Sequence, residues 1–501
     1  MTERISQLRN HSLNAINTLS VERAMLVTEF YKKSDTHLLS IPIQRALAFR
    51  HIMAHKVISI QPGELIVGER GPAPKATPTY PEVSLHSLDD LRILNTRPKV
   101  SFKVDDETFR IYEEEIIPFW KGKTQRDKVF QSLPQEWHDA YSAGVFTEFQ
   151  EQRAPGHTVG GKKLFLRGMN DVKVEIANVL KSIPASDKPD DFHRREQLSA
   201  MYVAADAIAL FAIRHAEELE RLAAQEKDEK RLNELIDMIR ICRKVPTHAP
   251  DTFHEALQHY WFIHLGVITE LNPWDSFNPG RLDQHLLPFY KKDIALGRLT
   301  KERAVELLQA FWIKFNNHPS PPKMGVTAEE SNTYTDFALI NLGGVKADGS
   351  DAVNELSYII LDVIEEMRLL QPSSMVQISK KSPQEFLKRA LKIVKTGFGQ
   401  PSIFNTDAII QQLLSHGKSI EDARNGGASG CVETGAFGTE AYTLSGYFNL
   451  NKVLEVTMHN GLIHGHKNKS EYTPETLTLS NRSMIFIMPL SSNSSILSTS
   501  K

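Results

Sequence analysis

Long amphipathic helices that alternate with short apolar runs constrain the fold of this chain more than any other feature. Residues 193–245 carry apolar side chains at three- and four-residue spacing over many turns. The same spacing recurs in the segments 299–315, 351–367 and 382–399. Between the helices lie short apolar runs that are typical of buried strands, at 64–70, 337–344, 374–379 and 401–405. Helices that alternate with buried strands predict an α/β fold.

The charge balance and the cysteine content narrow the class of protein. The 501 residues carry a formal net charge of −2, which favours neither nucleic acid nor an anionic membrane as a partner. No run of 18 or more apolar residues occurs, and the N-terminal residues lack the basic-then-apolar order of a secretory signal. With two cysteines, Cys242 and Cys431, neither a disulfide framework nor a four-cysteine metal site is expected. These features predict a cytoplasmic protein that binds neither nucleic acid nor membrane.

Three segments approach known motifs without completing them. In "HEALQH" (254–259), Gln258 stands where the zinc-binding helix H-E-x-x-H needs its second histidine, and His259 lies off the helical face of His254. "GFGQPS" (397–402) follows a helix rather than a strand, and "INLGGVKADG" (340–349) lacks the lysine and hydroxyl of a phosphate-binding loop. We therefore expect no metal or nucleotide site in these segments.

The segment "GGASGCVETGAFG" (426–438) is the strongest candidate for chemistry. Its glycines permit a sharp turn that directs one or two side chains into a cavity. A cysteine nucleophile needs a nearby cation or histidine, whereas the neighbour here is Glu433, which raises the pKa of the Cys431 thiol. A neutral thiol beside a carboxylate suits hydrogen-atom transfer, with the carboxylate available for proton transfer. The alternative is a half-buried structural thiol.

The segment from Ser429 to Gly461 resembles the cysteine loop of the glycyl radical enzymes, and within them is most similar to the trans-4-hydroxy-L-proline dehydratases. Other stretches resemble this family in the same order, among them "IQPGELIVGERG", "PGHTVGGKKLF", "NPWDSFNPGRLDQ" and "INLGGVKADGSDAVNELSYIILD". The resemblance covers roughly residues 10–461. Val432 follows Cys431, so the paired cysteines of pyruvate formate-lyase are missing, and Thr434 stands where choline lyases and diol dehydratases usually carry proline.

The resemblance implies a radical elimination. In the family, a radical stored on a backbone glycine by a radical S-adenosylmethionine activating enzyme passes to the loop cysteine, with no other cofactor bound. Cys431 as a thiyl would take a hydrogen atom from C5 of hydroxyproline, and loss of water would give 1-pyrroline-5-carboxylate. Glu433 would act as general base or acid, and Asp275 would contact the ring amine or the leaving hydroxyl.

The resemblance also implies a pocket and a fold. His157 would orient the substrate, and the pocket would be lined by Phe149, Ser331, Phe337 and Tyr447. The family fold is a ten-stranded α/β barrel of two half-barrels, which many helices surround and the cysteine loop threads; here we expect it to be incomplete. Its dry interior would protect a radical. A homodimer and a small-molecule substrate complete the expectation.

The C-terminal part departs from the family pattern. We expect residues 1–461 to form the N-terminal part of a pyruvate formate-lyase-type catalytic domain, and 462–501 to be an aberrant tail. A shifted reading of the codons from Ser470 can give an amphipathic helical pattern that looks like the continuation of the family. We therefore expect a frameshift, no glycyl radical domain in the chain as written, and no dehydratase activity of that chain. Two alternatives stay open: a glycyl radical enzyme for a diol, choline or an aryl acid, and a non-catalytic remnant.

Overall fold

The computed structural model describes residues 1–33, 35–147, 157–184, 188–271, 277–325, 328, 338–430, 432–442, 447–459, 462–463 and 477–478. Its helices are α1 (Glu3–Asn14), α2 (Glu22–Tyr31), η1 (Thr36–Leu38), α3 (Ile41–His55), α4 (Leu88–Thr96), α5 (Asp106–Ile111), η2 (Tyr112–Ile116), α6 (Ile117–Trp120), α7 (Gln125–Ser132), α8 (Gln135–Ser142), η4 (Lys162–Phe165), α9 (Met169–Ser182), α10 (Pro189–Ala223), α11 (Glu229–Lys244), α12 (Phe253–Glu270), α13 (Leu282–His285), α14 (Leu287–Ala295), α15 (Lys301–Asn316), α17 (Glu355–Met367), α18 (Gln384–Val394), α19 (Thr406–Ser415), α20 (Ile420–Asn425) and α21 (Leu450–Met458). Its strands are β1 (Thr18–Ser20), β2 (Ala76–Pro78), β3 (Phe146–Thr147), β4 (His157–Val159), β5 (Phe277–Asn278), β6 (Leu339–Gly343), β7 (Ser373–Ile378), β8 (Ser402–Asn405), β9 (Gly427–Ser429), β10 (Glu433–Gly435), β11 (Ala441–Tyr442), β12 (Tyr447–Phe448), β13 (Leu462–Ile463) and β14 (Leu477–Thr478).

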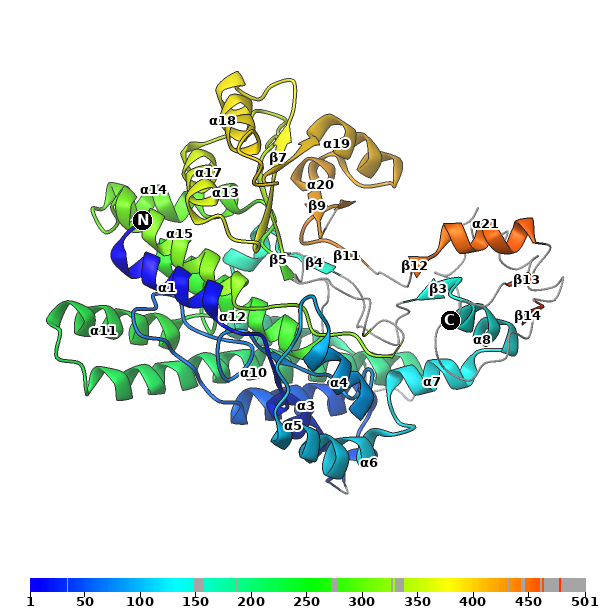
Figure 1. Ribbon diagram of the computed structural model, residues 1–501. Helices are drawn as coiled ribbons and strands as arrows, with labels where there is room; N and C mark the ends of the chain where they lie inside the picture. The colour runs from blue at the N-terminus through cyan, green and yellow to red at the C-terminus, as the bar shows by residue number, and fades with distance from the viewer. Residues whose placement is uncertain are drawn as a thin grey trace.

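Helix α12 forms the centre of the molecule. Almost every side chain along it is buried, and a helix that is buried around its whole circumference belongs to a core. A capping box between Thr252 and Glu255 fixes its first turn. Figure 1 shows α12 between the helices α10 and α11 on one side and the sheet-bearing part of the chain on the other. The core around α12 therefore lies next to the part of the chain that carries the sheet.

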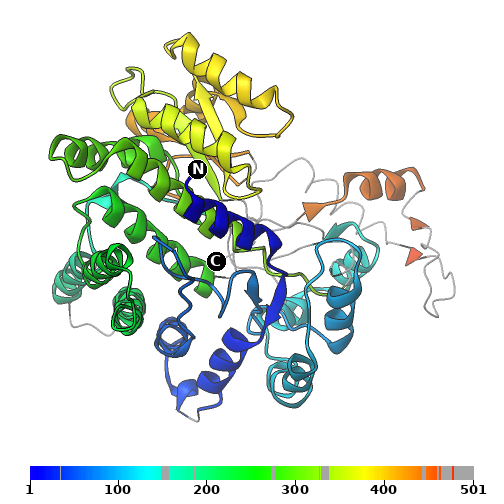
Figure 2. The ribbon, with the colours of Figure 1, turned by 60° about the vertical axis from the view of Figure 1, so that its left-hand side comes forward.

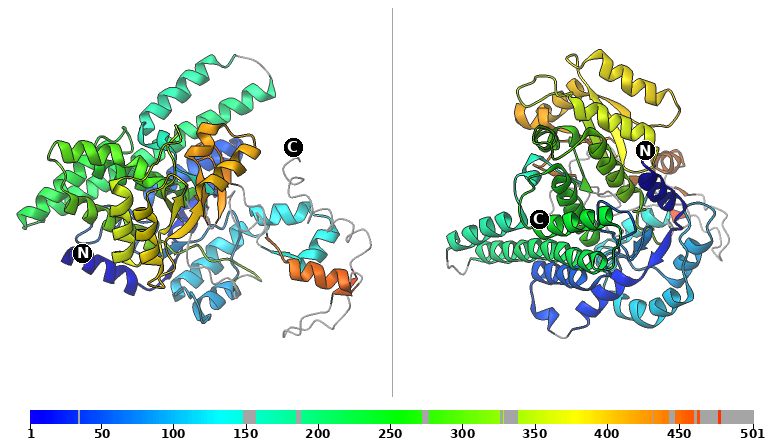
Figure 3. Two further views of the ribbon diagram at one scale, coloured as in Figure 1. Left: turned by 90° about the horizontal axis from the view of Figure 1, so that it is seen from above. Right: turned by 90° about the vertical axis from the view of Figure 1, so that its left-hand side faces the viewer.

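Helices α10 and α11 lie side by side as a long antiparallel pair, which Figure 3 shows from two further directions. By length and composition alone, α10 is the one helix in the described part of the chain that could cross a membrane. This is weak evidence, because core helices of soluble proteins pass the same test. Here α10 packs along α3, α9 and α11.

Strands β6, β7 and β8 form a parallel three-stranded sheet in that order. Helices α17 and α18 connect consecutive strands, as parallel pairing requires, and contact each other in the upper, yellow part of Figure 2. The apolar runs at 337–344, 374–379 and 401–405 thus contain strands, as predicted. The prediction of buried strands fails in part at β8, whose side chains are mostly exposed. The α/β class is confirmed, while the strands in the described ranges do not show a ten-stranded barrel.

The predicted strand at 64–70 is wrong. The segment is buried, but it pairs with no strand among the residues that the structure describes. The side-chain amide of Gln258 takes the place of a strand partner. Val67 N donates to Gln258 Oε1 (2.9 Å), and Gln258 Nε2 donates to Val67 O (2.9 Å). His254 binds the carbonyl oxygen of Leu65 at 2.7 Å. Side chains of α12 thus satisfy backbone groups that a neighbouring strand would otherwise pair.

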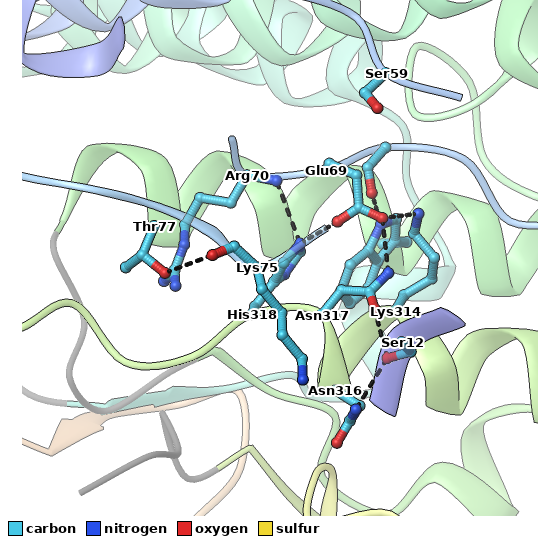
Figure 4. A network of polar contacts seen from close by, with 12 residues as sticks. Ser12, Ser59, Glu69, Arg70, Lys75, Thr77, Lys314, Asn316, Asn317 and His318 are labelled. Carbon is cyan, nitrogen blue, oxygen red and sulfur yellow. Dashed lines mark hydrogen bonds and ion pairs between the residues drawn. The ribbon is translucent and has the colours of Figure 1, made fainter. Parts of the chain in front are cut away.

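A buried polar network joins the N-terminal part of the chain to the end of α15 (Figure 4). Lys314 Nζ donates to Glu64 (2.8 Å) and also to Glu69. Asn317 donates to Glu69 at 2.9 Å, and Ser12 of α1 donates to Asn317 at 2.6 Å. These charged groups are almost fully buried and have lost their contact with water. Their ion pairs and hydrogen bonds therefore have to replace the interactions that water would provide.

We expect Lys314→Met to lower the free energy of unfolding by about 3–5 kcal/mol, because it leaves two carboxylates buried without their cation. Urea unfolding of the chain at neutral pH measures this loss. The control is Arg110→Met, which breaks an exposed pair with Glu107 and should change stability little. Equal losses in the two variants would contradict the account of the network.

Candidate cysteine-loop site

Strands β9 and β10 form an antiparallel hairpin within the segment singled out by its glycines. Ser429 pairs with Glu433 and Gly427 pairs with Gly435, so residues 430–432 connect the two strands. Gly430 has a φ of 53°, in the left-handed region that glycine adopts without strain. Cys431 itself lies outside the described residues. The strands on either side of it run in opposite directions, so the chain makes the predicted sharp turn.

Glu433 lies directly after the connection and is half-buried. Its Oε2 accepts a hydrogen bond from the backbone N–H of Val432 at 3.0 Å. Val432, which follows Cys431, is 65% exposed, whereas Gly426, Gly427 and Gly430 are buried. The carboxylate therefore folds back over the connection that contains the cysteine.

A second group of strands brings the segment "PGHTVG" beside the chain that follows the cysteine loop. His157 in β4 pairs with Tyr442 in β11, and Thr158 pairs with Phe277 at the start of β5. Figure 1 shows β4, β5, β9 and β11 close together in the centre of the molecule. The backbone thus places the strand that carries His157 next to the cysteine-loop segment.

Two glycines, Gly161 and Gly438, allow the backbones of these segments to approach closely. Gly438 N donates to the carbonyl oxygen of Val159 at 3.2 Å. A Cβ atom on Gly161 would lie 2.8 Å from the Cα of Gly438 and 3.1 Å from the carbonyl oxygen of Phe437. Any side chain at position 161 would therefore push the end of the cysteine loop away from β4.

We expect Gly161→Ala to destabilise the chain by about 1–3 kcal/mol, the usual cost of overpacking. Gly160→Ala is the matched control, since its added Cβ would meet ordinary contacts of 3.4 Å or more. Urea unfolding of both variants measures the difference. If Gly160→Ala proved as destabilising as Gly161→Ala, the close approach would not explain the loss.

The contacts of the described residues do not test the roles predicted for the remaining site residues. Tyr447 is described only through its backbone, in β12, where it pairs with Thr147 of β3. The predicted residues that lie outside the described part of the chain are Phe149, Asp275, Ser331, Phe337 and Cys431.

Buried polar side chains that the sequence analysis did not single out hold the cysteine loop from below. Asn341 of β6 and Gln377 of β7 reach β9 and the residue before it. Arg281 donates to the carbonyl oxygens of Arg424 (2.5 Å) and Gly343 (2.6 Å). The signal for Asn341 and Gln377 in the sequence is a polar residue within a predicted buried strand, and Arg281 lies in the quoted segment "NPWDSFNPGRLDQ".

Burial shifts the pKa values of two charged side chains near this loop. It lowers the pKa of Arg281 to about 10 and raises the pKa of Asp283 to about 6. Asp283 accepts from Gly343 N (2.8 Å) and from the hydroxyl of Ser357 (2.5 Å). The hydrogen bonds that these two groups make all go to backbone and hydroxyl partners, while Asp283 Oδ1 and Arg281 Nε have no hydrogen-bond partner among the described residues.

Histidines of the segment 254–259 bind backbone carbonyls. His254 contacts Leu65 O, and His259 contacts Leu164 O at 2.9 Å. Within the described ranges, no group of three or more His, Cys, Asp or Glu side chains could hold a metal ion.

Comparison with known proteins identifies the family. Residues 1–482 match the family described as pyruvate formate lyase-like. The chain belongs to this family. It is 52% identical over 459 residues to a trans-4-hydroxy-L-proline dehydratase of Clostridioides difficile, covering 92% of this chain and 58% of that protein.

Solved structures of the pyruvate formate lyase-like family agree with this assignment. The hydroxyproline dehydratase of Clostridioides difficile, solved with trans-4-hydroxy-L-proline bound, superposes with a TM-score of 0.89, 52% identity and coverage of 92% of this chain and 58% of the other. The B12-independent glycerol dehydratase of Clostridium butyricum, with glycerol bound, gives a TM-score of 0.86 at 32% identity, covering 93% and 59%. The chain spans less than two thirds of the length of these relatives.

Proposed function

We propose that this chain supplies the cysteine-bearing part of a glycyl radical dehydratase that removes water from trans-4-hydroxy-L-proline. The observation that carries the proposal is the contrast in identity. Over a similar share of the chain, identity to the hydroxyproline dehydratase is 52%, whereas identity to the glycerol dehydratase is 32%. All three proteins share one fold, so the fold alone does not explain the higher identity to the hydroxyproline dehydratase. The difference favours a substrate shared with that enzyme.

The chemistry assigned to Cys431 conserves atoms and electrons. As a thiyl, its sulfur takes a hydrogen atom from C5 of the substrate, where the ring nitrogen stabilises the carbon radical. The C4 hydroxyl then leaves as water with a proton from the ring amine. Cys431 returns the hydrogen atom to C4, and the C5–N double bond of 1-pyrroline-5-carboxylate remains.

The backbone glycyl radical of the family, when installed, supplies the unpaired electron. The described residues fit such chemistry, because the hairpin that carries Cys431 rests on buried amides and on a close approach at Gly427. A fixed backbone keeps a reactive sulfur directed at one carbon atom. The residues of this chain would bind, orient and protonate the substrate.

Glu433 is proposed as the group that moves the proton. Its position directly after the hairpin connection, half-buried, supports this role. We propose that Asp275 contacts the ring amine or the leaving hydroxyl and that His157 orients the substrate. Phe149, Ser331, Phe337 and Tyr447 would line the pocket. The pairing of β4 with β11 and β5 supports the placement of His157.

The barrel, the activating partner and the oligomeric state are proposed from the family. We propose that the β6–β7–β8 sheet is part of a ten-stranded barrel, that a radical S-adenosylmethionine enzyme activates the protein, and that the protein acts as a cytoplasmic homodimer. The frameshift and the domain division at residue 461 stay predictions. Sequencing of the nucleotides that encode residues 455–470 tests both.

An extended protein tests the function. It joins residues 1–461 to the C-terminal part of the Clostridioides difficile dehydratase and is activated anaerobically by a radical S-adenosylmethionine activating enzyme. Offered trans-4-hydroxy-L-proline, glycerol and choline separately, it should turn over the first. Turnover of glycerol or choline instead would support the other-substrate alternative. No turnover of any, with a glycyl radical signal present, would support the remnant.

A further inference from the structure

Strand β9 has a strand partner, β10, along one edge and a side chain along the other. Ala428 N donates to Asn341 Oδ1 (3.1 Å), and Asn341 Nδ2 donates to Ala428 O (2.8 Å). The amide of Asn341 therefore pairs with both backbone groups of one residue, as a neighbouring strand would. Asn341 and Ala428 are fully buried, which makes each lost hydrogen bond costly.

A second amide orients the first. Gln377 Nε2 donates to Asn341 Oδ1 (3.2 Å) and to the carbonyl oxygen of Gly426 (3.1 Å). Gln377 pairs in register with Gly343, two residues after Asn341 on β6, so both amides lie on the same face of the sheet. Together the two amides bind the backbone on both sides of Gly427.

The edge of β6 cannot take β9 as a further strand. Asn341 N donates to the carbonyl oxygen of Gly280 at 2.9 Å on one side, and β7 occupies the other side. The cysteine-loop hairpin therefore meets the face of the sheet, where side chains alone can reach it. This explains why two buried amides lie on the face of the sheet that the hairpin meets.

Gly427 has to be a glycine for this contact to exist. A Cβ atom there would lie 2.3 Å from Asn341 Oδ1, 2.5 Å from Gln377 Nε2 and 2.6 Å from the ring of Phe437. The backbone of β9 and the two amides thus approach more closely than any side chain permits.

We propose that Asn341 and Gln377 are positioning residues that fix the register of the cysteine loop, and through it the place of the Cys431 sulfur. The proposal rests on the proposed function of Cys431. A slip of β9 by one residue would reverse the faces of the hairpin. A displacement of about 1 Å at a reacting atom can reduce turnover about 100-fold.

The chain offers a matched control for the amides. Gln258 makes the same two-point pairing with Val67, is equally buried and lies on α12, away from the hairpin. Gln258→Met and Gln377→Met remove an amide of the same size from the two sites. Asn341→Leu removes the central amide, and Gln377→Met keeps the test available if that variant does not fold.

The first measurement is hydrogen–deuterium exchange of the chain without activation. In Asn341→Leu and Gln377→Met, the amides at 426–430 should exchange at least about 10-fold faster, while Gln258→Met should leave them unchanged and accelerate Val67. Unchanged exchange at 426–430 in both loop variants would overturn the proposal.

The second measurement is turnover by the activated extended protein. The loop variants should lose about 100-fold in kcat with little change in KM and with the glycyl radical signal retained, whereas Gln258→Met should keep its kcat. Equal kcat losses in all variants would mean that the amides act only through stability, and would overturn the proposal. If the parent protein itself does not turn over while exchange behaves as expected, the fixed register is supported and the proposed function fails.

Discussion

Replacing Cys431 with serine will abolish turnover of trans-4-hydroxy-L-proline by the activated extended protein. The O–H bond of serine is stronger than the S–H bond of cysteine, so a serine oxygen radical cannot form at the expense of the enzyme's own radical. Turnover should fall to the background of the unactivated protein, measured as 1-pyrroline-5-carboxylate formed under anaerobic conditions.

The other cysteine of the chain provides the control. Cys242 is buried in α11, and burial raises the pKa of its thiol far above the ordinary value. Cys242→Ala should keep the kcat of the parent protein. Measurable turnover by Cys431→Ser would mean that the elimination does not proceed through a sulfur radical.

Mild acid will unfold the chain. Burial lowers the pKa of His215 and His285 to about 3, of His254, His259 and His318 to about 4, and of His264 well below its usual range. Between pH 6.5 and these values, the unfolded chain binds protons that the folded chain does not. Stability is therefore fully present above pH 6.5 and is lost as the pH falls.

The loss should be steep. The slope that each such histidine contributes grows as the pH falls below 6.5 and approaches about 1.4 kcal/mol per pH unit. Burial raises the pKa of Asp283 to about 6 and also raises the pKa of Glu64, and these two carboxyls offset part of the loss because the folded state holds their protons. The histidines outnumber these carboxyls, so the free energy of unfolding should fall by about 5 kcal/mol in all between pH 7.5 and 5.5, a large part of a typical folding free energy.

Urea unfolding at pH values from 7.5 to 5.5 measures this slope. His259→Gln should reduce the total loss over this range by about 1.4 kcal/mol, while His193→Gln, at an exposed position, should not change it. A free energy of unfolding that stays constant down to pH 5.5 would show that these histidines are accessible to protons in the folded state.

Sequence periodicity predicted the sheet well where strands pair with strands. The apolar runs that contain β6, β7 and β8 follow helices at the spacing that parallel sheets need, and each became a strand. The same reasoning failed at 64–70. There Gln258 supplies the backbone partner, and an apolar run alone does not reveal whether its partner is a strand or a side chain.

The parts of the site that depend on neighbouring residues in the sequence were predictable. The glycines around Cys431 indicated a sharp turn, and β9 and β10 form one. Asn341 and Gln377 were not predicted, because a polar residue in a buried strand signals only that it needs a partner. Their partners at Ala428 and Gly426 lie far along the chain and depend on the fold.

The path of a hydrogen atom tests the central claim most directly. The activated extended protein is given trans-4-hydroxy-L-proline that carries two deuterium atoms at C5, and the product is reduced at once to proline. Because Cys431 takes hydrogen from C5 and returns it to C4, we expect deuterium at C4 as well as the deuterium retained at C5. Deuterium confined to C5, with C4 hydrogen drawn only from water, would contradict transfer through the cysteine.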